Sequence, residues 1–177
     1  FGLENLALPT KVIRRRVAEM AAFFGMEPWF RKKTSELSGG QKRRAAIAGV
    51  IVTEPEVLVL DEPVAGLDPV GKREFLSLLH DLHKKFVKTV VIVTHDMDLV
   101  SENCTRAAVF SHGKVIKTGT PREIFEDEKA VLSTGLDIPV TAYLTKRLRE
   151  CGVIIESDLS VKNFTDRFAE KFAEGKV

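Results

Sequence analysis

Apolar residues near the start of the chain recur with a helical period. Between residues 9 and 24, one face carries Ile13, Val17, Met20 and Phe24, at i, i+4, i+7 and i+11. A stripe of this kind is typical of an amphipathic helix that packs one side against a core. The pattern therefore predicts a helix over Pro9–Phe24 with its charged residues in water.

Two short, continuous apolar runs in the middle of the chain predict strands. Val57–Leu60 and Thr89–Thr94 are rich in β-branched residues and too short for helices. Unbroken runs are typical of strands that are buried on both faces of a parallel sheet. A helix predicted from Pro69 to about Phe86 separates them, so strand, helix and strand alternate. We expect an α/β fold with a parallel sheet and right-handed crossovers.

After the second strand, the pattern predicts a short helix over Met97–Cys104 and then a hairpin. Its strands are expected at Ala107–Phe110 and Val115–Lys117, on either side of a turn at His112-Gly113. A helix started by Pro121 follows. This arrangement would close the sheet-containing part of the chain.

Beyond Gly135 the apolar period is wholly helical. Ser160 has the position of a helix cap, and the helix after it carries the apolar stripe Val161, Phe164, Phe168 and Phe172. We expect a small helical appendage over residues 135–177. Two helices have little core of their own, so the stripe is either core or a docking surface.

Composition is that of an ordinary globular protein and limits its partners. The chain has 177 residues, 44% of them hydrophobic and 29% charged, and its net charge of +2 is too small to predict nucleic-acid binding. Cys104 and Cys151 have no metal-ligand spacing, which favours reduced thiols. The longest apolar run, Ala45–Val52, is far below the ~20 residues that cross a bilayer. Membrane association would therefore need a partner.

The segment Leu37–Gln41, LSGGQ, has the features of a phosphate-binding helix start. Its two glycines allow close approach of the backbone, and the amides that follow point outward at the positive end of the helix dipole. The next three residues, Lys42–Arg44, are basic, against the usual preference for acids in a first turn. Either a nearby anion or simple exposure to solvent would account for them.

Two acidic residues and a histidine follow the predicted strands. Asp61 and Glu62 come directly after the first strand and His95 directly after the second. Open α/β sheets bind ligands at the carboxyl ends of their strands. The sequence therefore predicts a ligand site that these three residues share.

These segments resemble four motifs of the ABC ATPase family, in the family's order. Leu37–Gln41 is similar to the signature motif, Val57–Glu62 to Walker B, Ala65–Asp68 to the D-loop and Val93–Asp96 to the switch histidine segment. The resemblance implies an ABC ATPase core of the parallel-sheet P-loop NTPase class, with ATP and Mg²⁺ as cofactors.

The resemblance also implies a role for each residue. Asp61 would hold Mg²⁺ through its water shell, Glu62 would act as general base or orient the attacking water, and His95 would contact the γ-phosphate. In a head-to-tail dimer the signature residues would close on an ATP held by the other subunit, and the D-loop would couple the two sites. The signature set is Ser38, Gly39, Gly40 and Gln41, and the D-loop set is Gly66, Leu67 and Asp68.

A P-loop is missing from this pattern. Nothing in the sequence matches G-x-x-x-x-G-K-[ST]; the segment Gly66–Lys72 has the glycine and lysine spacing but continues with Arg73. Asp68 within it would also repel phosphate. A Q-loop is absent as well, and Phe1-Gly2-Leu3 resembles the residues that come just after a Q-loop. We therefore expect the chain to be the C-terminal portion of a longer ATPase and inactive alone.

Within the family, the chain is similar to the ATP-binding subunits of energy-coupling-factor importers, the cobalt, nickel and vitamin uptake group. This similarity includes Gln41–Gly49, Glu54–Leu58 and Gly135–Pro139. It implies a second ATPase subunit and a transmembrane coupling subunit as partners, at the cytoplasmic face of the membrane, and no nucleic acid. Pro9–Phe24 would lie near a coupling helix, and Val140–Phe172 would help to pair the ATPases.

The expected domains are an ATPase part over 1–134 and the appendage over 135–177. The ATPase part would comprise a helical subdomain over about 1–50 and a sheet core over about 51–127. Two other functions stay open: a non-catalytic dimerisation or docking fragment, and an ABC ATPase of DNA repair. The near-neutral charge and the lack of coiled-coil heptads weigh against DNA repair.

Overall fold

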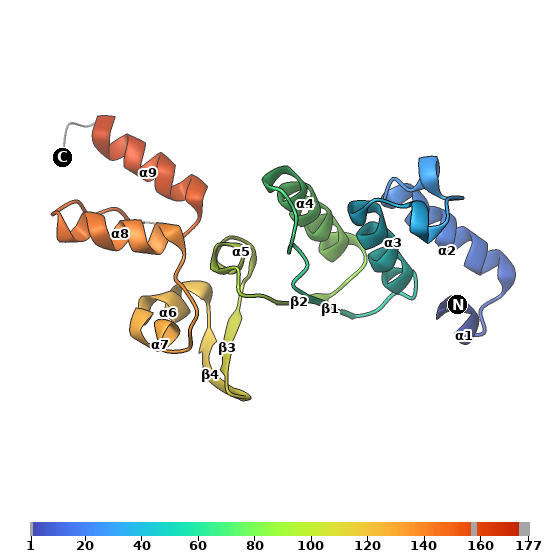
Figure 1. Ribbon diagram of the computed structural model, residues 1–177, viewed down its shortest axis with the longest axis horizontal. Helices are drawn as coiled ribbons and strands as arrows, with labels where there is room; N and C mark the ends of the chain where they lie inside the picture. The colour runs from blue at the N-terminus through green and yellow to red at the C-terminus, as the bar shows by residue number, and fades with distance from the viewer. Residues whose placement is uncertain (1, 157–158, 174–177) are drawn as a thin grey trace. The chain divides into compact units, whose positions relative to one another are not determined.

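The computed structural model describes residues 2–156 and 159–173 and shows two compact units, Phe1–Val93 and Thr94–Val177. Helices and strands carry the labels of Figure 1.

Helices dominate the first part of unit 1. It begins with α1 (Gly2–Asn5), α2 (Thr10–Phe23), the 3-10 turns η1 (Glu27–Trp29) and η2 (Thr34–Glu36), and α3 (Gly39–Ile51). The predicted face of α2 is confirmed, since Met20 and Phe24 are buried. The small residues Ala45, Ala48 and Gly49 of α3 line a groove against α2.

The strands of unit 1 confirm the predicted parallel pair. β1 (Val57–Asp61) pairs with β2 (Thr89–Val93), and α4 (Pro69–Lys85) connects them (Figure 1). Three side chains of α4, Phe75, Leu79 and Leu82, are buried at helical spacing. The register sets Asp61 opposite Val93, so the carboxyl ends of both strands lie together.

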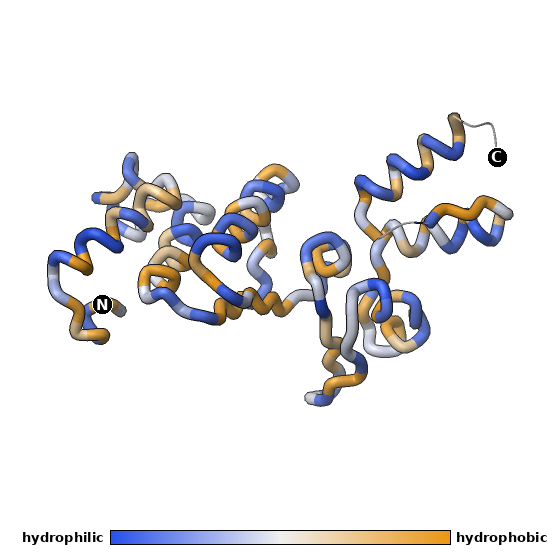
Figure 2. The backbone as a smooth tube through the Cα atoms, turned by 180° about the vertical axis from the view of Figure 1, so that it is seen from behind, coloured by the Kyte–Doolittle hydropathy of each residue, from blue (hydrophilic) through white to orange (hydrophobic). Residues whose placement is uncertain are grey.

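The expectation that both faces of this sheet are buried is wrong for the described chain. Val57, Val59, Val91 and Val93 keep 53%, 62%, 41% and 53% of their surface exposed. They alternate with more buried residues such as Leu58, which is 3% exposed, so one face is covered and the other is open. Figure 2 shows this part of the chain as an apolar stretch. The strands have the composition of a covered sheet, but the described residues of unit 1 leave the second face open.

Unit 2 contains the predicted hairpin and helices. They are α5 (Met97–Asn103), β3 (Ala107–Ser111), β4 (Lys114–Gly119), α6 (Pro121–Glu126), α7 (Glu128–Leu132), α8 (Val140–Glu150) and α9 (Val161–Ala173). β3 and β4 are antiparallel, and the turn at His112-Gly113 has positive φ at both residues, 48° and 74°. Turns of this kind match the twist of a hairpin.

The core of unit 2 draws on residues from both sides of Gly135. Val109, Ile124, Phe125 and Val131 form a buried cluster, and Leu136, Ile138 and Leu159 pack against it. The Thr141 hydroxyl, at the start of α8, donates to the Leu159 carbonyl at 2.6 Å. The segment after Gly135 therefore packs onto the hairpin and α6.

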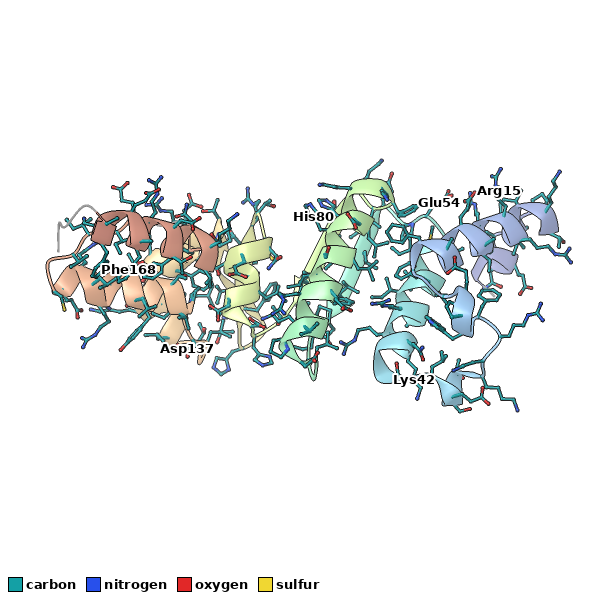
Figure 3. All side chains as sticks on the ribbon, turned by 90° about the horizontal axis from the view of Figure 1, so that it is seen from above. Arg15, Lys42, Glu54, His80, Asp137 and Phe168 are labelled. Atoms are coloured by element: carbon teal, nitrogen blue, oxygen red, sulfur yellow. The ribbon has the colours of Figure 1, made fainter. Side chains whose placement is uncertain are left out.

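The aromatic stripe of the last helix divides between core and surface. Phe164 is buried, and its ring is followed along α9 by Phe168 and Phe172, with centroid separations of 6.0 and 4.2 Å. Phe168 is labelled in Figure 3. Phe172 is 48% exposed. The amide of Asn163 donates to the Ser160 hydroxyl, which confirms Ser160 as the cap.

Candidate nucleotide-binding site

The segment Ser38–Gln41 forms the first turn of α3, as its sequence predicted. The Ser38 hydroxyl accepts a hydrogen bond from the Gln41 amide at 3.3 Å, and the Gln41 side-chain oxygen accepts one from the Ser38 amide at 2.9 Å. This reciprocal capping box holds the helix start in one conformation. Leu37, just before it, is buried, whereas Ser38, Gly39 and Gly40 are exposed.

An exposed helix start of this kind suits an anion. The first amides of a helix have no partner within the helix, and they lie at the positive end of its dipole. Gly39 and Gly40 carry no side chain that could shield them, and a Cβ at either position would have no neighbour within 4 Å. A phosphate group can therefore approach this turn closely.

Asp61 and Glu62 lie at the carboxyl end of the strand pair. Asp61 is the exposed last residue of β1, and the Glu62 amide donates to the Val93 carbonyl at 2.9 Å. Glu62 has φ of 43°, a left-handed conformation that costs a non-glycine residue on the order of 1 kcal/mol. Pro63 and Val64 are buried directly after it. The backbone therefore turns sharply at Glu62, and buried neighbours hold the turn.

The D-loop residues follow within the same unit. The Ala65 amide donates to the Glu62 carbonyl and the Leu67 amide to the Val64 carbonyl, both at 3.2 Å, and Gly66 has φ of 70°. Asp68 then caps α4, and its Oδ1 accepts from the Gly71 amide at 2.8 Å. The segment 66–72, which has P-loop spacing, is therefore this turn and the first turn of α4.

His95 belongs to unit 2, so the structure does not bring it together with the two carboxylates in one unit. It is exposed and lies between β2 and α5. The Asp96 amide next to it donates to the Thr94 hydroxyl at 3.1 Å, and Asp96 caps α5 by accepting from the Leu99 amide at 2.9 Å. Along the chain, His95 comes two residues after Val93, the register partner of Asp61.

Two arginines at the start of α3 have partners that the sequence did not indicate. Arg43 donates through Nη2 to the Ala65 carbonyl at 3.0 Å, and Arg44 forms an ion pair with Glu74 of α4 at 3.4 Å. Lys42 is exposed (Figure 3). The sequence indicated only that basic residues occupy the first turn of a helix, where the helix dipole favours acidic ones. The partners of Arg43 and Arg44 lie 22 and 30 residues away, beyond any local pattern.

The residues of this site fit a Mg²⁺ ion that is held mainly by water and phosphate. Within residues 2–156 and 159–173, no group of three or more His, Cys, Asp or Glu side chains could hold a metal. Asp61 is a single exposed carboxylate at a strand end. Mg²⁺ keeps several waters and is often bound by one or two carboxylates plus substrate phosphates. ATP fits in part. The start of α3 and the carboxylates after β1 suit the neighbourhood of its phosphates, but the sequence has no P-loop to bind them.

Comparisons with known proteins agree with this geometry. Residues 3–65 match the family model of the ABC transporter. A solved structure, cbiO1 of Clostridium perfringens, part of the ABC transporter complex CbiONQ, aligns with a TM-score of 0.65 and 42% identity over 82% of this chain and 58% of that one. The chain therefore carries part of an ABC transporter ATP-binding domain, and its fold is that of an ABC ATPase domain of the P-loop NTPase class.

Within that family its relatives are of the energy-coupling-factor type. The chain is 45% identical over 150 residues to the energy-coupling factor transporter ATP-binding protein EcfA of Methanocaldococcus jannaschii, covering 85% of this chain and 53% of that protein. It is 40% identical over 171 residues to EcfA1 of Streptococcus thermophilus, covering 96% of this chain and 62% of that protein. The chain thus spans little more than half the length of these relatives.

Proposed function

We propose that the chain is part of an ATP-hydrolysing subunit of an ABC-type importer. The observation that carries the proposal is the joint presence, in one compact unit, of the exposed glycine-bearing start of α3 and the carboxylate pair Asp61-Glu62 at a parallel strand end. One feature suits a phosphate and the other suits Mg²⁺ and water. Phosphoryl transfer needs little more from a protein than positioning and charge stabilisation.

The proposed chemistry divides between residues that serve two nucleotides. Asp61 would hold Mg²⁺ through water, and the bound ion would supply positive charge next to the phosphates. Glu62 would orient the attacking water or take its proton, and the resemblance to ABC ATPases assigns His95 to the γ-phosphate. Ser38–Gln41 and Gly66–Asp68 face the nucleotide of a second ABC ATPase subunit. The chain therefore provides two half-sites, and we expect it to be inactive without a phosphate-binding segment.

A transmembrane subunit is the second proposed partner. The groove between α2 and α3 is lined by apolar side chains, among them Val17, Met20, Met26 and Phe30. Phe30 is 50% exposed there. An amphipathic helix of a partner fits such a groove. No helix in the described part of the chain is long and apolar enough to span a bilayer, and we place the protein at the cytoplasmic face of the membrane through this partner.

The class of solute rests on the resemblance of the sequence to energy-coupling-factor importers, and the relatives agree with that group. They are energy-coupling factor proteins and a CbiO protein. We therefore propose uptake of cobalt, nickel or a vitamin. The same relatives are transporter components, which leaves the DNA-repair alternative without support.

The test uses the longer protein that contains this chain together with a P-loop segment. We expect Mg²⁺-dependent ATP hydrolysis that falls at least about a hundredfold in Glu62→Gln, because general-base groups contribute about 10²–10⁴ in rate. Glu19→Gln is the matched control: Glu19 lies exposed on α2 and pairs only loosely with Arg15, at 3.7 Å. Its rate should equal that of the wild type.

Two results would contradict this function. Equal hydrolysis by Glu62→Gln and Glu19→Gln would remove the catalytic role of Glu62. A longer protein that binds no ATP but dimerises through residues 135–177 would favour the non-catalytic docking function instead. The exposed side chains of Val140, Tyr143 and Leu144 on α8 are available for such contacts.

A further inference from the structure

Arg43 extends from the signature helix to the D-loop. Its Nη2 donates to the Ala65 carbonyl at 3.0 Å, and its guanidinium carbon lies 5.8 Å from the centre of the Phe75 ring. Phe75 is 7% exposed, so the ring that the guanidinium contacts is a buried side chain of α4. One side chain of α3 thus contacts the backbone between β1 and α4 as well as a core residue of α4.

The geometry selects arginine over lysine at this position. A planar guanidinium can stack on an aromatic ring and donate in its own plane at the same time, whereas an ammonium is a compact, strongly hydrated point charge. A hydrogen bond from a charged donor is also stronger than a neutral one. The ring and the carbonyl therefore fix the orientation of the guanidinium. Its Nη1 is buried and has no partner among the described residues.

Asp68, at the end of the D-loop, is fixed by its cap on α4, but Ala65 and Gly66 before it have fewer restraints. The D-loop turn is closed by two backbone hydrogen bonds of 3.2 Å, and Ala65 and Gly66 are exposed. Glycine also allows the backbone more freedom than other residues. The hydrogen bond from Arg43 of α3 can therefore fix the position of this turn.

We propose that Arg43 is a positioning residue that holds the D-loop in a fixed relation to the signature helix. This inference rests on the proposed function, which sets both segments against the nucleotide of a second subunit. With the contact in place, the first turn of α3 and the D-loop approach that nucleotide as one rigid surface. Without it, the D-loop turn moves independently of α3, and the hydrolysing geometry forms less often.

The first test measures hydrogen exchange of the longer protein without nucleotide. Arg43→Met keeps the apolar stem but cannot donate to the Ala65 carbonyl, and we expect about tenfold faster exchange of amides 65–67, a typical effect of losing one charged hydrogen bond. Exchange of α4 at residues 75–82 should stay at the wild-type rate, which separates a local release from general destabilisation. Arg73→Met, at an exposed position of α4, is the matched control and should change neither segment.

The second test measures ATP hydrolysis by the same variants. We expect kcat of Arg43→Met to fall about tenfold with KM for ATP within about twofold, because the proposed function sets the segments that Arg43 joins against the nucleotide of the other subunit. Arg43→Lys keeps the charge without the planar donor and should fall between Arg43→Met and the wild type in both tests.

D-loop exchange and kcat in Arg43→Met equal to those of Arg73→Met would overturn the proposal. Should Arg43→Met also loosen residues 75–82, Arg43→Lys decides, and wild-type exchange at 65–67 in that variant overturns the inference. A wild-type protein that hydrolyses no ATP defeats the proposed function, while the exchange measurement still decides whether Arg43 holds the D-loop.

Discussion

The carboxylate of Asp68 caps helix α4, and Gly71 lies directly against it. Oδ1 of Asp68 accepts from the Gly71 amide at 2.8 Å, and a Cβ added at Gly71 would lie 2.7 Å from that same oxygen. Real Cβ atoms essentially never come so close, so the carboxylate would have to leave its capping position. Gly71→Ala therefore tests the cap from the side of its donor.

The expected magnitude depends on two opposing effects. Alanine in place of glycine normally stabilises a helix by about 0.5–1 kcal/mol. Loss of an aspartate cap costs about 1 kcal/mol, within a range of about 0.5–2. In the wild-type chain the two nearly cancel. In Asp68→Ala, which has no carboxylate to displace, only the gain remains and Gly71→Ala should stabilise by about 0.5–1 kcal/mol. The other nearby atoms, on Leu67, are at ordinary contact distances of 3.6 and 3.8 Å.

The double-mutant cycle isolates this interaction, and the chain contains a suitable probe. Trp29 is the single tryptophan, it is 8% exposed, and it belongs to the same compact unit as α4. Urea unfolding followed by Trp29 fluorescence should give a coupling energy of about 1 kcal/mol between Asp68 and Gly71. Asp68→Asn serves as the control, because asparagine caps as well as aspartate and should lose only the charge–dipole part, about 0.3–1 kcal/mol.

Additive effects would refute the reasoning. If Gly71→Ala changes stability equally in the wild-type and Asp68→Ala chains, within about 0.3–0.5 kcal/mol, the cap does not contribute as the geometry indicates.

Two further predictions concern a thiol and the open face of the sheet. Burial raises the pKa of the Cys104 thiol, so less of it is thiolate at pH 8, and alkylation measured by mass spectrometry should be at least about tenfold slower at Cys104 than at the exposed Cys151. The Cys104 rate should keep rising with pH above about 8.5, the usual thiol pKa, and equal rates at the two cysteines would contradict this account. Val59 is 62% exposed, so Val59→Lys should change the stability of this chain by less than about 0.5 kcal/mol, but should lower the soluble yield of a longer protein in which the face is covered. Unchanged yield there would show that the face stays open.

Features set by neighbouring residues could be predicted from the sequence. The starts of α3, α4 and α9 are marked by cap residues, Ser38, Asp68 and Ser160. The side chain of each accepts a hydrogen bond from the amide three positions later. The parallel pair is indicated by two apolar runs with a helix between them. The place of Asp61 and Glu62 at a strand end is predictable because both residues directly follow the apolar run that forms the strand.

Features set by distant residues could not. A continuous apolar run indicates that a strand is suited to burial on both faces, but it does not show what covers either face, and Val59 is open here. The basic run at Lys42–Arg44 left an anion and solvent as equal alternatives. The structure gives Arg43 a backbone carbonyl 22 residues away, a kind of partner that no spacing rule identifies. The roles of Glu62 and His95 stay predictions.

The open sheet face and the proposed half-site have a common physical basis. A strand that pairs in parallel with β1 or β2 presents its carboxyl end at the same edge as Asp61, because parallel strands share their direction. A helix that follows such a strand packs on a face of the sheet, and here the face of Val57, Val59, Val91 and Val93 is available. A strand, phosphate-binding loop and helix would therefore bring the loop to Asp61 in the same step that buries the valines. Under the proposed function, completing the core and completing the nucleotide site are one event, so substitutions on the open face should impair both together.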